Sequence, residues 1–75
     1  MDEKQPKFDI TMFKSVEMVD DFFGKGTYDQ IRQEAGDFSD LMKLATDYGM
    51  PELVTRYYTD IMLVAFIAHK RRSQS

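Results

Sequence analysis

The C-terminal stretch from Pro51 to Arg71 constrains the fold more than any other part of this sequence. It contains no glycine and no further proline, and Pro51 stands where a helix can begin because its missing amide hydrogen is not needed there. We expect one helix of roughly 20 residues, which corresponds to a length of about 30 Å. The basic residues at its end complement the negative pole of a helix dipole.

Apolar side chains occur on two sides of this predicted helix. One group forms the continuous stripe typical of a helix packed on a core: Val54, Tyr57, Tyr58, Ile61, Val64, Ala65 and Ala68. A second group lies on the other side and consists of Met62, Leu63, Phe66 and Ile67. A helix that is apolar all round has to be buried all round, so either the other helices wrap its C-terminal half or this second face meets another chain.

The N-terminal part predicts a first helix from Thr11 to Phe23, capped by Asp9 or Thr11 and ended by Gly24. Met18 and Phe22 lie apart from its main apolar stripe, one helical turn from each other. We expect these two side chains to contact another helix of the same domain.

Two shorter helices follow. Thr27 to Gln30 has the form of a capping box, and the helix it begins ends at Gly36. Asp37 is expected to cap the next helix, which ends at Gly49. No alternating strand pattern is present, so the sequence predicts an all-α fold, a compact bundle of three shorter helices packed on a long C-terminal helix. Residues 1–75 form a single helical domain in this interpretation, with residues 1–8 and 72–75 expected to be flexible.

The residue inventory argues against catalysis. The chain of 75 residues has no cysteine and one histidine, so thiolate and histidine-cluster metal sites are excluded. His69 lies among basic residues near the end, and the acidic residues fall mainly at helix caps and first turns, where the helix dipole favours them. We therefore expect no enzymatic activity, no metal and no cofactor.

Charge disfavours a nucleic-acid ligand. All 13 acidic residues precede Ile61, so the body of the chain is acidic. The second helix, Gly36 and the third helix have helix-turn-helix dimensions, but the third helix would present Asp40, Lys43 and Asp47 to phosphates. The basic cluster is kept as a candidate anion contact: Lys70, Arg71 and Arg72.

The sequence thus favours a non-enzymatic protein-interaction module that acts stoichiometrically as a regulator, inhibitor or assembly factor. The second apolar face would form a homodimer or dock a protein partner, with Arg56 and Tyr58 at its rim. The alternative is a dimeric nucleic-acid-associated regulator that uses the basic C-terminus. The longest apolar run, Ile61 to Ala68, is too short for a membrane span, which needs about 20 residues. With no export signal and no cysteine, a cytoplasmic location is expected.

Overall fold

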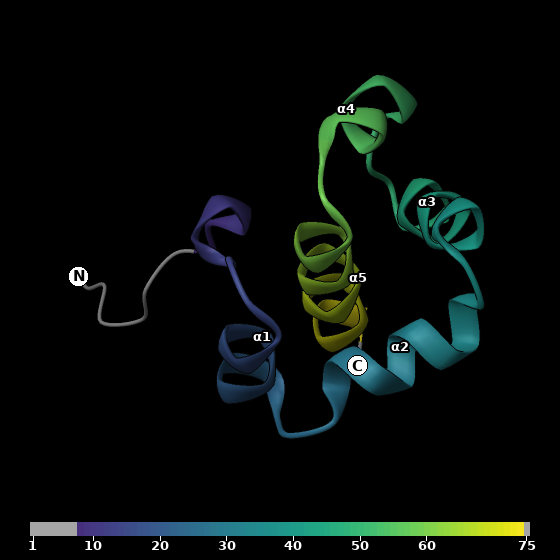
Figure 1. The fold of residues 1–75 in the computed structure, drawn as a ribbon. Helices are drawn as coiled ribbons and strands as arrows, with labels where there is room; N and C mark the ends of the chain where they lie inside the picture. The colour runs from purple at the N-terminus through teal and green to yellow at the C-terminus, as the bar shows by residue number, and fades with distance from the viewer. Residues whose placement is uncertain (1–7, 75) are drawn as a thin grey trace.

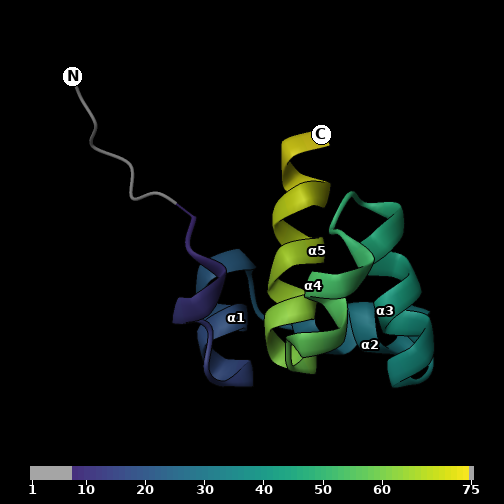
Figure 2. The same ribbon diagram turned by 90° about the horizontal axis from the view of Figure 1, so that it is seen from above.

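The computed structural model describes residues 8–74, in which helices are joined by short connections and no strand is present. The elements are a 3-10 turn η1 (Ile10–Met12) and the helices α1 (Val16–Phe23), α2 (Thr27–Ala35), α3 (Phe38–Asp47), α4 (Glu52–Tyr57) and α5 (Asp60–Gln74). The long helix α5 stands in the middle, with α1, α2 and α3 packed around it (Figures 1 and 2). The predicted all-α bundle on a long C-terminal helix is confirmed.

The predicted helix over residues 51–71 is interrupted, which corrects its bounds. Tyr58 has an extended backbone, with φ −96° and ψ 145°, and its N–H donates to the carbonyl of Thr55 to close α4. A new helix then begins, because the carbonyl of Thr59 accepts the N–H of Leu63 and Asp60 places an acid in the first turn. In the sequence, Thr59 followed by Asp60 is a helix-start signal that stands inside an otherwise apolar stretch.

The core is built around α5. Neighbouring helices cover it on several sides, so Leu63 and Ile67 are both 0% exposed. This corrects the expectation that these two residues belong to an outward face. Small residues make the close packing possible, because Ala35 on α2 and Ala45 on α3 are buried at the centre of the bundle. The same cluster of buried side chains also includes Phe13, Val19, Ile31, Leu41, Met50, Val64, Ala65 and Ala68.

The first predicted helix divides into two elements, so its start and its cap were wrong. Asp9 accepts from the N–H of Thr11 but caps only the short turn η1. The backbone then extends through Phe13, and Ser15 caps α1 by accepting from the N–H of Met18 at 3.3 Å. Extension at this point turns the Phe13 ring into the core instead of leaving it on a helix surface.

Of the two helix caps predicted for α2 and α3, only the cap of α3 forms. The capping box predicted from Thr27 does not form, because the N-cap is Gly26 and the Thr27 hydroxyl donates instead to the carbonyl of Gly24 at 2.6 Å. Gly26 has φ +89°, a conformation that a residue with a side chain rarely adopts. The cap predicted at Asp37 is confirmed, since its carboxylate accepts the N–H of Asp40 at 2.9 Å.

Phe8 packs against the bundle. Its ring stacks on His69 with centroids 3.9 Å apart and also contacts Phe13 and Phe23. At the other end, α5 extends to Gln74. The flexibility expected for Phe8 and for residues 72–74 stays a prediction. The other residues in that expectation, 1–7 and 75, lie outside the described part of the chain.

A polar contact joins α2 to the start of α5. The Tyr28 hydroxyl donates to Asp60 Oδ2 at 3.0 Å, and Arg32 Nε lies 3.8 Å from the same oxygen. The N–H of Tyr28 also donates to Asp20 Oδ1, which ties α1 to the same corner. Partial burial and the bond to the Asp60 carboxylate raise the pKa of Tyr28 above its ordinary value of 10.0.

Alkaline titration should reveal this contact. A tyrosine whose pKa is raised by folding stabilises the fold below its unfolded pKa, and this stabilisation is lost as pH rises through the folded pKa. We expect Tyr28→Phe to cost about 1 kcal/mol of unfolding free energy at neutral pH, through the lost hydrogen bond. The deficit should stay constant up to about pH 10, the ordinary pKa of tyrosine, and should shrink as the pH rises further through the raised folded pKa. Urea unfolding of Tyr28→Phe at a series of pH values measures the deficit, with Tyr57→Phe, at an exposed tyrosine on α4, as the control. A deficit for Tyr28→Phe that does not change with pH would contradict the hydrogen bond from Tyr28 to Asp60 as its cause.

Candidate protein-interaction groove

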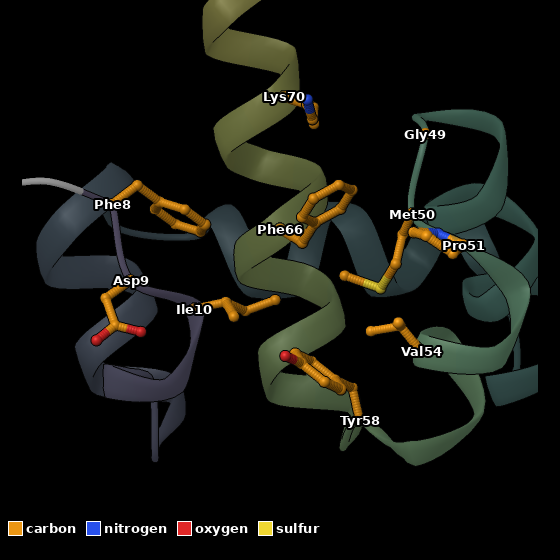
Figure 3. A pocket seen from close by; sticks show the side chains of 10 residues that line it. All are labelled: Phe8, Asp9, Ile10, Gly49, Met50, Pro51, Val54, Tyr58, Phe66 and Lys70. Atoms are coloured by element: carbon orange, nitrogen blue, oxygen red, sulfur yellow. The ribbon is translucent and has the colours of Figure 1, made fainter.

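A groove of about 430 Å³ runs beside α5, between the N-terminal segment and α4 (Figure 3). Phe66 of α5 lies at its centre, with Phe8 and Ile10 on one side and Val54 and Tyr58 on the other (Figure 3). Most of its lining is apolar, and the full set is Phe8, Asp9, Ile10, Gly49, Met50, Pro51, Val54, Tyr58, Phe66 and Lys70. We call this feature the α5 groove.

The interruption between α4 and α5 creates the groove. If residues 51–71 formed one straight helix, α4 would continue the axis of α5 and could not stand beside it. The extended backbone at Tyr58 instead lets α4 pack on α3. Val54 and Tyr58 then face Phe66 across the groove (Figure 3).

Aromatic contacts fix the opposite wall. The Phe8 ring is held on His69 by parallel stacking, with an angle of 8° between the rings. At one end of the groove Lys70 places its Nζ 5.5 Å from the centroid of the Phe66 ring, within the range of a cation–π contact. The groove therefore has an apolar floor and a single positive charge at that end, while Asp9 lies on the wall formed by the N-terminal segment.

The surface beside the groove is also apolar. Leu53 and Tyr57, one helical turn apart on α4, are mostly exposed, and Val54 is partly exposed between them. Arg56 is exposed as well and pairs with Glu52 on the same helix at 3.2 Å. A short helix that exposes large apolar side chains next to an apolar groove is unusual for an isolated chain.

The predicted interface residues fall into three groups. Phe66 and Tyr58 are brought together in the α5 groove, whereas Leu63 and Ile67 lie in the core. Met62 is half-buried and does not line the groove. Arg56 lies on α4 outside it. The interruption at Tyr58 places Arg56 on a different helix from the four predicted anchors, which all lie on α5.

Sequence reasoning missed much of the groove lining. Phe8 and Ile10 precede the predicted first helix, and their apolar side chains in a largely polar stretch were the available signal. Met50 and Val54 were not singled out as site residues because nothing in the local pattern places the α3–α4 connection beside α5.

The three basic residues at the end of α5 do not converge on one site. Lys70 lies over Phe66, and Arg72 Nη1 donates to the carbonyl of Phe23 at 3.1 Å. Arg71 pairs with Glu34, and its Nε donates to the Tyr48 hydroxyl at 3.1 Å. Partial burial opposes the charge of Arg71, but the bonds to Tyr48 and Glu34 outweigh it and raise its pKa.

Other site types gain no support from the geometry. Within residues 8–74, no three histidine, aspartate or glutamate side chains gather where they could hold a metal ion. None of the helices in the described range is long and apolar enough to cross a membrane. On α3, the residues that would face DNA are exposed as expected: Ser39, Asp40, Lys43 and Asp47.

Comparison with known proteins gave no match, either to a family model, to a curated protein or to a solved structure.

Proposed function

We propose that this chain is a non-enzymatic protein-interaction module that acts stoichiometrically, as a regulator, inhibitor or assembly factor, by docking a partner protein in the α5 groove. The observation that carries the proposal is the groove itself, an apolar hollow centred on Phe66 with Tyr58 and Val54 on one wall. Aromatic and methionine side chains of this kind are enriched in protein interfaces. No catalytic residue or cofactor forms part of the proposal.

The lining sets the chemistry of the partner. Phe66, Ile10 and Val54 favour a segment that inserts two or three large apolar side chains. Lys70 at the end of the groove favours a carboxylate at the corresponding end of that segment. Exposed Leu53 and Tyr57 on α4 would extend the contact beyond the groove.

The partner in this proposal is a different protein, and a second copy of this chain is the other outcome. The absence of cysteine suits a reducing compartment, and we propose the cytoplasm as the place of action. Light scattering on a sizing column separates the two outcomes, because a homodimer would double the mass of the isolated protein.

Val54→Asp is the sharpest test of the groove. Val54 lines it and is partly exposed on the short helix α4, so a charge there should cost little folding stability and should oppose an apolar ligand. In affinity capture from the source cells, quantified by mass spectrometry, we expect a specific partner to be retained by the wild type and to fall at least roughly tenfold with Val54→Asp.

Gln33→Asp supplies the matched control. Gln33 is exposed on α2 away from the groove, so the variant gains the same charge without touching the proposed site. The control should retain the partner at the wild-type level. Equal retention by all three proteins, with unchanged circular dichroism spectra, would rule out docking through the α5 groove.

A further inference from the structure

A second apolar surface lies on α1 and the turn before it. Met12, Met18 and Phe22 are 43%, 46% and 41% exposed, respectively. The three side chains line a hollow of about 330 Å³ together with Asp21. We call this surface the α1 face. Met18 and Phe22 were expected to contact another helix, but nearly half of each residue is exposed, and the rings that Phe22 contacts are those of Phe13 before α1 and Phe23 on α1 itself.

The α1 face combines one phenylalanine that packs on the core with two flexible methionines. Phe22 packs edge-on against Phe13 and Phe23, with ring centroids 5.4 and 4.8 Å away, so its position is fixed by the core. Methionine side chains are flexible and polarizable, and they suit surfaces that adjust to the shape of a ligand. Two methionines beside an anchored phenylalanine therefore favour an apolar ligand without requiring one particular side-chain shape.

Acidic residues border this surface. Asp21 lines the hollow, and Glu17, one helical turn earlier, is exposed on the same side of α1. Bases lie at the ends of α1: the backbone N–H of Lys14 donates to Met18 Sδ at 3.3 Å, Lys25 is exposed just beyond the helix, and Arg72 donates to the carbonyl of Phe23. The edge formed by Glu17 and Asp21 is thus the acidic part of the α1 face, and this edge complements a cationic ligand.

We propose that the α1 face binds a basic amphipathic helix of a partner protein. The apolar stripe of such a helix would cover Met18 and Phe22, and its lysine or arginine residues would lie along Glu17 and Asp21. The acidic border disfavours an anionic lipid surface. It also disfavours the pairing of two α1 faces in a symmetric dimer, because each copy would bring the same Glu17 and Asp21 carboxylates to the contact.

This inference is independent of the α5 groove. Ile10 lines the groove and Met12 lines the hollow on α1, so the single turn η1 separates the two surfaces. Variants at Val54 and variants on α1 can therefore be compared in the same binding assay. Loss of one function without the other identifies which proposal fails.

The test uses defined peptides and the intact protein. The probe is an amidated helix of about 14 residues with leucine at positions i, i+3, i+4 and i+7 and lysine elsewhere. One control peptide carries glutamate in place of lysine, and another keeps the composition but alternates leucine and lysine. We expect the lysine helix to bind at least roughly tenfold tighter than either control in calorimetry. The NMR chemical-shift changes that it causes in the protein should fall on residues 12–22.

Protein variants then separate the apolar contribution to peptide binding from the contribution of the two carboxylates. Met18→Ser should weaken the lysine helix by about fivefold through lost apolar contact. The double variant Glu17→Gln and Asp21→Asn should weaken it by roughly three- to tenfold. Val54→Ser leaves the α1 face intact and should bind like the wild type.

A second double variant controls for net charge. Asp29→Asn with Asp47→Asn removes the same two charges from exposed positions on α2 and α3 and should bind like the wild type. An equal loss of affinity in both double variants would show that binding depends on the net charge of the protein alone, and this result would overturn the proposal. Equal binding of the lysine and glutamate helices, or no binding at about 1 mM peptide, would overturn it as well.

Discussion

Leu63→Ala should leave this protein largely unfolded. Leu63 is fully buried between helices that all pack on α5, and truncation of such a leucine costs about 2–5 kcal/mol through lost burial and a residual cavity. A single core in a chain of this size supplies only roughly 3–5 kcal/mol. Circular dichroism at 25 °C (about 298 K) and urea unfolding check the result.

Met62→Ala is the matched control because Met62 is the adjacent residue and only half-buried. It should cost about 1 kcal/mol or less and keep a cooperative transition. The pair also decides between the two interpretations of the second apolar face. If Leu63 were a docking residue, Leu63→Ala would keep the wild-type unfolding curve and lose only a partner.

Phe13→Ala should have an effect of similar size. Phe13 is buried, and its ring packs against those of Phe8 and Phe23, with centroids 5.6 Å away in each case. Removing a buried phenylalanine costs about 3–5 kcal/mol, and here the cavity would open under both the N-terminal segment and α1. Urea unfolding followed by circular dichroism measures the loss.

Met12→Ala provides the comparison for Phe13→Ala, since the neighbouring side chain is exposed on η1. We expect it to change the unfolding free energy by about 0.5 kcal/mol or less. A Phe13→Ala protein as stable as Met12→Ala would mean that the aromatic cluster does not hold the N-terminal segment in place.

The helix ends that depend on glycine could be predicted from the sequence. Gly24, Gly36 and Gly49 all have positive φ angles and end α1, α2 and α3 near the expected points. This signal is reliable because few residues other than glycine adopt that conformation. The interruptions without glycine, after Met12 and at Tyr58, were missed, because threonine, serine and aspartate are also tolerated inside helices.

Burial of α5 was one of two alternatives that the sequence left open. Short helices can wrap a long one fully because helices approach each other closely where small side chains meet. Ala35, Ala45 and Ala65 are all buried at the centre, so α2 and α3 can pack tightly enough to cover both Leu63 and Ile67.

The candidate site was harder to predict than the fold. The groove collects Phe8, Met50, Val54 and Phe66 from segments that are far apart in the sequence. A single sequence carries no information on which of these segments become neighbours. Phe66 was identified because it belonged to the second apolar face of the predicted helix, and Tyr58 because it was placed at the rim of that face.

The turn η1 contributes a side chain to each of the two surfaces. Ile10 and Met12 belong to the same three-residue turn, which Asp9 caps at one end. If a ligand in the groove displaced this turn and thereby changed the affinity of the α1 face, reciprocity would require a ligand on the α1 face to change the affinity of the groove by the same factor.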